Sequence, residues 1–96
     1  MKIKTQYVTH MQMYYKSHEI NLAMDLKERT GLRIKTLRTE KNLKQEDLAW
    51  QANVDRTYMN HVETGKRNIT LASLEKIVVN GLQMSLSDFF NDEMFK

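Results

Sequence analysis

The chain has 96 residues and no cysteine, which predicts one domain with a modest hydrophobic core and excludes a disulfide framework. Its formal net charge is +3, and no apolar run is long enough for a membrane-spanning helix or for the core of a signal peptide. We therefore expect a cytoplasmic protein with no membrane partner. Because a small core leaves a fold only marginally stable, we also expect a homodimer.

Residues 1–30 are expected to form an N-terminal extension of strand and helix character. Ile3, Thr5 and Tyr7 alternate with polar residues, which predicts a strand, and helical spacing replaces this pattern from residue 17 onward. A single strand needs a partner for its backbone, so we interpret the segment as an arm or as an added dimer element. The alternative is that translation starts at Met24 and that the preceding segment has little function.

The remainder of the chain, residues 31–96, is expected to form a compact all-α domain whose junction with the extension lies near Gly31. Its first helix is predicted over residues 32–41. In that helix Ile34 faces the core, and Asn42 ends the helix.

Residues 45–63 contain two short helical patterns that meet at a tight turn. In the first pattern Leu48 and Ala52 share one face, and Ala49 lies beside them, where a small side chain lets a second helix approach closely. Asn53 stands at the turn, where asparagine is the best-tolerated substitute for glycine in left-handed backbone. This arrangement predicts a helix-turn-helix unit.

The second helix of this unit is predicted to begin at Asp55, whose carboxylate can accept hydrogen bonds from the free amides of the first turn. Met59 and Val62 form a narrow buried stripe, which leaves the rest of the helix facing outward. Gly65 follows where a left-handed residue is needed to end the helix.

The outward face of this helix carries side chains suited to a DNA groove. Arg56 matches guanine, Thr57 matches a thymine methyl group or a phosphate, and Asn60 matches adenine. The first turn is also the part of a docked recognition helix that reaches base edges. The side chains expected to contact DNA phosphates are Gln45, Tyr58, His61, Lys66, Arg67 and Asn68. The simpler alternative is the solvated polar face of a helical bundle.

Two further helices are predicted after a polar loop. Thr70 can cap a helix over residues 71–80, and Gly81 is expected to end it. Ser85 then begins the last helix in a capping-box pattern with Asp88.

These last two helices carry more apolar side chains than a small core needs, and such a surplus marks an interface. The residues expected at a dimer interface are Val79, Met84, Leu86 and Phe90. Phe90 fits a core position equally well. A two-fold contact there would place two recognition helices about 34 Å apart, one turn of DNA.

Together these motifs resemble a known family. The resemblance rests on Gln45, Leu48-Ala49, Ala52, Val54, Met59, Val62, Glu63-x-Gly65-x-Arg67-Asn68 and Leu71-x-x-Leu74-x-x-Ile77. The sequence resembles the five-helix repressor-like helix-turn-helix domains of phage and bacterial regulators. More narrowly, it resembles the controller proteins of type II restriction-modification systems. It departs from the family at Asn53, where glycine is usual, at Met59, where a branched aliphatic residue is usual, and in its N-terminal extension.

The resemblance implies both a function and a contact. The function is sequence-specific binding of a homodimer to a pseudo-palindromic double-stranded DNA operator. There the protein activates its own gene and an endonuclease gene at one occupancy and represses them at a higher one, which makes RNA polymerase a candidate partner. The contact is a structural ion pair between Arg38 and Glu63. The alternatives are a phage-type repressor or antitoxin autoregulator whose N-terminal segment binds another protein, and a helical adapter that binds only proteins.

Other chemistries find no support in the sequence. His10, His18 and His61 lack metal-ligand spacing, and no cysteine assists them. No serine stands in a nucleophile elbow, and the three glycines do not form a phosphate-binding loop. We therefore expect no metal, no cofactor and no enzymatic activity.

Overall fold

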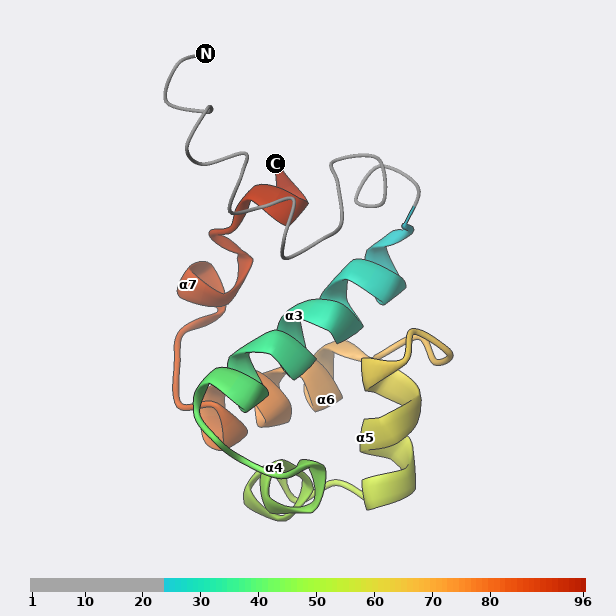
Figure 1. The fold of residues 1–96 in the computed structure, drawn as a ribbon, viewed down its shortest axis with the longest axis vertical. Helices are drawn as coiled ribbons and strands as arrows, with labels where there is room; N and C mark the ends of the chain where they lie inside the picture. Colours follow the sequence, from blue (N-terminus) through green and yellow to red (C-terminus); the bar gives the residue numbers. More distant parts are fainter. Residues whose placement is uncertain (1–23) are drawn as a thin grey trace.

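The computed structural model describes residues 24–96, and these residues are helical with no strand among them. The helices are α3 (Leu26–Glu40), α4 (Gln45–Ala52), α5 (Arg56–Glu63), α6 (Leu71–Glu75), which continues directly into the π-helical turn η1 (Lys76–Gly81), and α7 (Leu86–Phe90), followed by the 3-10 turn η2 (Glu93–Phe95). The all-α, five-helix fold expected from the sequence is confirmed (Figure 1). The strand expected near the N-terminus lies outside the described residues.

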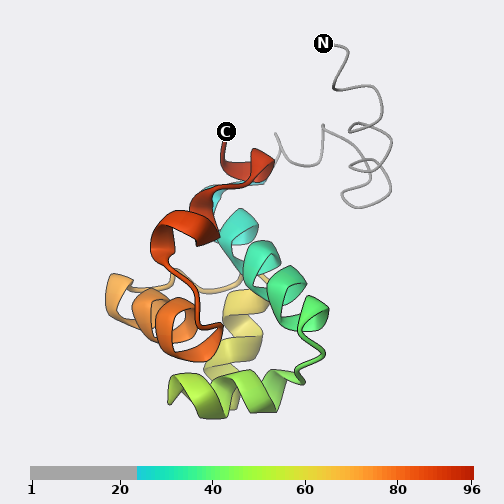
Figure 2. The same ribbon diagram turned by 90° about the vertical axis from the view of Figure 1, so that its left-hand side faces the viewer.

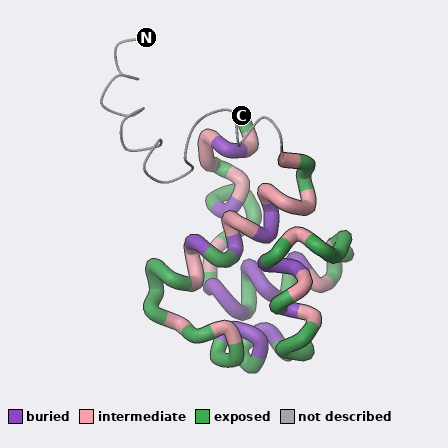
Figure 3. The backbone as a smooth tube through the Cα atoms, turned by 45° about the vertical axis from the view of Figure 1, so that its right-hand side comes forward, coloured by how far each residue is buried: buried purple, intermediate pink, exposed green. Residues whose placement is uncertain are grey.

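The core lies where α3, α4 and α5 meet the continuous α6–η1 segment. Figure 3 shows buried residues on the inward side of these helices and exposed residues around the outside. The buried hydrophobic residues are Ile34, Leu48, Ala49, Ala52, Met59, Val62, Leu74, Ile77, Val78, Leu82, Phe89 and Met94. The inward positions expected from helical spacing are therefore buried, because the apolar stripe of each helix has no other way to leave water.

Helix α3 begins at Leu26, so the start predicted at residue 32 is wrong. Asp25 caps it through a capping box: its Oδ1 accepts from the Glu28 amide at 3.0 Å, and Glu28 Oε1 accepts from the Asp25 amide at 2.9 Å. Hydrogen bonds from the Lys27 ammonium and the Glu28 amide hold the pKa of Asp25 below its ordinary value. The capping signal was present in the sequence, but it precedes the glycine that was interpreted as a junction.

Gly31, the expected junction, lies inside α3 and is buried. A β-carbon at this position would overlap the carbonyl oxygen of Val62 and would lie 3.1 Å from the Val62 carbonyl carbon. The glycine therefore lets α3 approach the last turn of α5. A glycine that serves close packing and a glycine that serves a flexible linker look the same in a sequence.

Several chain reversals match their predictions. Asn42 and Asn53 both adopt left-handed backbone, with φ of 58° and 57°, and Gly65 follows α5 with φ of 74°. Thr70 caps α6 by accepting from the Ser73 amide at 3.0 Å. These positions were predictable because few residue types tolerate left-handed backbone or cap a helix.

The stop predicted at Gly81 is wrong, because η1 includes Gly81 and the left-handed residue is Gln83, with φ of 57°. The widened turn is visible in the hydrogen bond from the Leu82 amide to the Ile77 carbonyl, which spans five residues at 2.8 Å. A β-carbon at Gly81 would lie 2.7 Å from Leu48 Cδ1. This glycine also serves close packing, here between η1 and α4.

The C-terminal segment is fastened to α3 by an arginine. Arg33 donates from Nε to the Phe89 carbonyl at 2.8 Å and forms an ion pair with Asp92 at 3.1 Å. Figure 2 shows this segment running back along α3. Ser85 caps α7 as predicted, accepting from the Asp88 amide at 3.0 Å. Arg33 therefore braces the fold instead of adding to a free cationic surface.

Candidate nucleic-acid interface

The turn between α4 and α5 fixes how α5 is presented. The Val54 amide donates to the Ala49 carbonyl at 3.0 Å, which closes the reversal begun by the left-handed Asn53. Asp55 Oδ2 then accepts from the Thr57 amide at 2.8 Å and from the Tyr58 amide at 3.2 Å. The start of α5 is thus capped as predicted, and the buried Ala49 lets the two helices lie close together.

The three predicted base-reading residues lie together on α5. Arg56, Thr57 and Asn60 are all exposed, whereas Met59 on the opposite face is buried. With Gln45 of α4, the three line an open hollow of about 300 Å³. The structure therefore places a guanidinium, a hydroxyl and an amide around one depression at the beginning of α5.

Arg56 is held only loosely. Its Nη1 lies 3.7 Å from Glu46 Oε1, and the two side chains are 69% and 59% exposed. An ion pair at such a distance and exposure contributes little, because water screens both charges. Arg56 can therefore leave Glu46 at little cost and reach toward a ligand.

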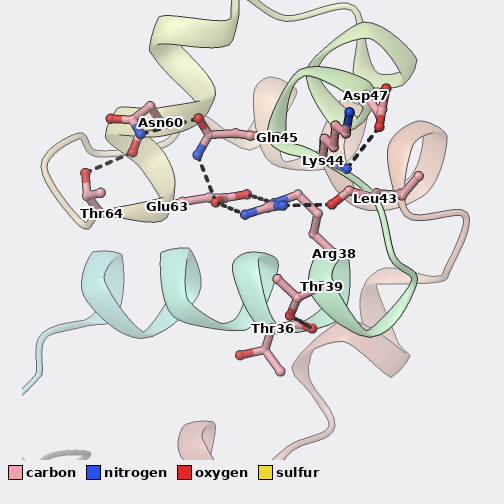
Figure 4. A network of polar contacts seen from close by, with 10 residues as sticks. All are labelled: Thr36, Arg38, Thr39, Leu43, Lys44, Gln45, Asp47, Asn60, Glu63 and Thr64. Atoms are coloured by element: carbon pink, nitrogen blue, oxygen red, sulfur yellow. Dashed lines mark hydrogen bonds and ion pairs between the residues drawn. The ribbon is translucent and has the colours of Figure 1, made fainter.

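The ion pair expected between Arg38 and Glu63 is present and buried (Figure 4). Arg38 Nε lies 2.7 Å from Glu63 Oε2, and Nη2 lies 3.0 Å from Oε1. The remaining Nη1 donates to the Leu43 carbonyl at 2.7 Å. The Glu63 side chain is 1% exposed, so these hydrogen bonds must offset the loss of water around the carboxylate.

Gln45 makes contacts that sequence analysis missed. Its Nε2 donates to Glu63 Oε1 at 3.0 Å, and its Oε1 accepts from Asn60 Nδ2 at 3.3 Å. Gln45 therefore joins a predicted base-reading residue to the buried ion pair (Figure 4). The available signal was chemical: Arg38 cannot occupy every acceptor site of the Glu63 carboxylate, so another donor was needed.

Several predicted phosphate contacts follow α5 along the chain. Lys66, Arg67 and Asn68 are exposed, and His61 is half-buried. The Arg67 guanidinium lies over the Tyr58 ring, 5.1 Å from its centroid, which holds the loop beside α5.

Tyr58 itself requires a correction. Its hydroxyl oxygen is buried and has no hydrogen-bond partner among the described residues, so it does not point outward to a phosphate. The side chain packs against the core cluster and supports Arg67. Helical spacing alone could not show this, because the depth of the hydroxyl depends on the loop that folds over it.

The predicted interface residues are unequally exposed. Val79 and Leu86 are exposed, whereas Met84 and Phe90 are half-buried against the core cluster. Phe90 makes edge contacts with Phe89 and Phe95, each with ring centroids 4.9 Å apart. Phe90 is therefore half-buried in a cluster of aromatic rings.

Three exposed apolar side chains were not predicted as surface features: Leu26, Trp50 and Leu71. Leu26 and Leu71 border a hollow of about 230 Å³ that Phe90 also lines. Within residues 24–96, no group of three or more histidine, cysteine, aspartate or glutamate side chains could hold a metal ion. No helix in that part of the chain could cross a membrane.

Comparison with known proteins assigns the family. The helix-turn-helix family matches residues 34–79, a range that includes Arg56, Thr57 and Asn60. The control protein C.MunI of Mycoplasma sp is 49% identical over 69 residues, an alignment that covers 71% of this chain and 92% of that protein. The solved wild-type restriction-modification controller protein C.Esp1396I is 43% identical, with a TM-score of 0.67 over 75% of this chain and 91% of that chain. This chain belongs to the restriction-modification controller proteins.

Another solved controller protein, C.AhdI from Aeromonas hydrophila, is 36% identical, with a TM-score of 0.63 over 67% of this chain and 96% of that chain. C.Esp1396I has also been solved as a tetramer in complex with its natural 35 base-pair operator, and that chain has a TM-score of 0.67 to this one. This controller protein therefore shares its helical domain with relatives that include one solved on DNA.

Proposed function

We propose that this controller protein regulates transcription by binding duplex DNA sequence-specifically as a homodimer on a pseudo-palindromic operator. One observation carries the proposal. Arg56, Thr57 and Asn60 are exposed together around an open hollow at the start of α5, the part of a helix-turn-helix that reaches base edges. A solvated helical face would not need a guanidinium, a hydroxyl and an amide converging on one depression.

Each of these side chains has a role in direct readout. Arg56, once it leaves Glu46, can donate two hydrogen bonds to guanine O6 and N7. Thr57 can contact a thymine methyl group or a phosphate, and Asn60 can bond adenine through one donor and one acceptor. The base preference of a half-site thus follows from three adjacent residues.

Phosphate contacts fix the register of α5 in the groove. Lys66, Arg67 and Asn68 are exposed in the loop after α5, and His61 lies partly exposed on the helix itself. The stacking of Arg67 on Tyr58 directs the guanidinium along α5 before DNA arrives, which reduces the ordering cost on binding.

The homodimer follows from the apolar surface near the C-terminus. Val79 and Leu86 expose apolar side chains, and Met84 and Phe90 lie half-buried beside the same core cluster. A two-fold contact through these residues would set two copies of α5 about 34 Å apart, which matches successive major grooves on one side of DNA. The tetrameric complex of C.Esp1396I with its operator supports assembly on DNA by this family.

The regulated genes follow from the family. We assign to this protein the control of its own gene and of a restriction endonuclease gene, with activation at one occupancy, repression at a higher one, and RNA polymerase as a partner in activation. Its relatives are named control proteins, which supports the assignment. We assign no catalytic activity to it, and we place its action in the cytoplasm, where its DNA lies.

The test is the salt dependence of affinity for duplex DNA. Phosphate contacts release counterions, so the logarithm of the association constant should fall steeply and linearly with the logarithm of salt concentration, by about 0.9 for each phosphate neutralised. A helical adapter that binds only proteins would show no such binding to duplex DNA. An absence of binding to duplex DNA would refute the proposed function.

A further inference from the structure

We propose that Gln45 is a positioning residue that fixes the orientation of the Asn60 amide, and thereby contributes to the base preference of the protein. The inference rests on the proposed function, because it concerns how Asn60 meets a base. It replaces the phosphate contact expected of Gln45 with a contact inside the protein.

The anchor of this arrangement is the buried Arg38–Glu63 pair. A guanidinium has only donors, so both oxygens of the Glu63 carboxylate accept from Arg38, at 2.7 and 3.0 Å. Arg38 is itself held by the Leu43 carbonyl at 2.7 Å. The direction of hydrogen bonding is therefore fixed at the buried end and cannot reverse.

That direction passes to Gln45. Glu63 Oε1 also accepts from Gln45 Nε2 at 3.0 Å, and a carboxylate that accepts from Arg38 can offer Gln45 only an acceptor. The two ends of a glutamine amide are nearly equal in size, so the partners decide which end faces which way. Here the Gln45 nitrogen must face Glu63, and its oxygen must face α5.

The Gln45 oxygen in turn orients Asn60. It accepts from Asn60 Nδ2 at 3.3 Å, which occupies one of the two hydrogens of that nitrogen. One N–H and the Oδ1 atom remain free at the exposed end of Asn60, beside the hollow that Arg56 and Thr57 also line. One donor beside one acceptor is the pattern that pairs with adenine N7 and N6 in the major groove.

The hydrogen bonds from Asn60 to Gln45 and from Gln45 to Glu63 form a relay that orients Asn60. The relay matters because the side chain of an exposed asparagine is otherwise free to rotate. Ordering a free side chain on binding costs roughly 0.5–1.5 kcal/mol, which corresponds to roughly a 2- to 13-fold change in affinity. With Gln45 in place, that ordering is already present in the free protein. Removal of the Gln45 amide should therefore weaken binding most where Asn60 meets its preferred base.

The first measurement uses the free, full-length protein. We would replace Gln45 by methionine, which keeps the length of the side chain and removes its amide, and record the side-chain amide signals of Asn60 by NMR. Gln45→Met should move the chemical shifts of the two Nδ2 hydrogens of Asn60 toward those of a freely rotating asparagine. Gln51→Met, an exposed glutamine on the same helix, should leave them unchanged. Asn60→Ala identifies the signals, because it removes them.

The second measurement uses duplexes in which the base contacted by Asn60 is varied. Gln45→Met should lower the preference for adenine at that position by roughly 2- to 13-fold, and this loss should vanish in the Asn60→Ala background. Equal weakening of all four duplexes in both backgrounds, with a smaller salt slope, would return Gln45 to a phosphate role and overturn the proposal.

Two controls distinguish the effect of Gln45 on the orientation of Asn60 from effects on folding and on DNA binding in general. Thermal unfolding of each variant is recorded, and Gln45→Ala serves as a second variant if methionine lowers the midpoint. Unchanged Asn60 signals in a folded variant would refute the contact itself. If the wild-type protein binds no duplex, the proposed function is refuted, and with it the effect of Gln45 on base preference. The amide signals of Asn60 would still decide whether Gln45 orients Asn60.

Discussion

Replacement of Gly31 by alanine should destabilise the fold, although alanine is the better helix former. Gly31 lies in the interior of α3, where alanine should gain about 1 kcal/mol from helix propensity. The new methyl group would overlap the Val62 carbonyl oxygen and would lie 3.1 and 3.2 Å from the carbonyl carbons of Val62 and Glu63. These are backbone atoms of α5, so no side-chain rotation can make room.

The magnitude follows from these two opposing effects. Overpacking a core costs about 1–3 kcal/mol and occasionally more. The Gly31→Ala clash involves backbone at the end of α5, which the Arg38–Glu63 pair also holds in place. Its cost therefore lies at or above the upper end of that range. After the gain in propensity is subtracted, we expect a net loss of about 2 kcal/mol, which for a domain of this size lowers the midpoint of thermal unfolding by roughly 8–16 °C.

Thermal and urea unfolding followed by circular dichroism provide the assay. Lys35→Gly and Lys35→Ala, at an exposed position of the same helix, measure the propensity difference without a packing change. Subtracting that difference from the effect of Gly31→Ala isolates the steric cost. A Gly31→Ala protein as stable as the wild type, or more stable, would refute the close contact between α3 and α5.

Four other outcomes are expected. Arg56→Ala should lose discrimination at one or two base pairs, at a cost of about 1–3 kcal/mol against the preferred site, measured by competition between duplexes. Arg67→Ala should weaken all duplexes alike and reduce the salt slope by about 1. Leu86→Glu should weaken the dimer by about tenfold or more in sedimentation experiments, because burial of a leucine contributes about 1.5–3 kcal/mol. The Asp25 carboxylate, whose pKa the Lys27 hydrogen bond lowers, should stabilise the fold above the ordinary aspartate pKa, and this contribution should be lost as pH falls through the lowered pKa, as seen by comparing unfolding midpoints of wild type and Asp25→Ala.

A control variant or a contrary result tests each of these outcomes. Equal loss on random duplexes would move Arg56 to a phosphate role. Lys96→Ala removes an exposed cation at the C-terminus and serves as the control for Arg67→Ala. It should leave the salt slope of DNA binding unchanged. Ala72→Glu adds the same charge at an exposed position of α6, and a dimer weakened equally by it and by Leu86→Glu would point to general repulsion. A difference between wild type and Asp25→Ala that does not change with pH would contradict the capping charge.

Much of the helical unit was predictable because local chemistry determines it. Asp55 and Thr70 cap their helices as expected, and Asn53 takes the left-handed conformation that the tight turn requires. The apolar spacing of Met59 and Val62 predicted which face of α5 is buried, and therefore which face remains free for DNA. These features depend on residues within one helical turn of each other.

The roles of Gly31, Gly81 and Gln45 were missed because they depend on contacts between distant parts of the chain. Gly31 was interpreted as a junction and Gly81 as the end of a helix, but the atoms that require glycine there belong to Val62 and to Leu48. Gln45 was assigned to a phosphate, because nothing local reveals its contact with Glu63, eighteen residues further along the chain. The residue types were informative in each case, but their partners became known only from the packing of α3, α4, α5 and η1.

We propose that a homodimer of this protein reads duplex DNA through the exposed start of α5. Selection of bound sequences from a random duplex pool tests it most directly, with wild type and Arg56→Ala selected in parallel. We expect an enriched inverted repeat whose half-site centres lie about one DNA turn apart. In each half-site, one base pair should lose its preference in the Arg56→Ala selection. Enrichment of no sequence, or of the same repeat with unchanged preferences by both proteins, would contradict it.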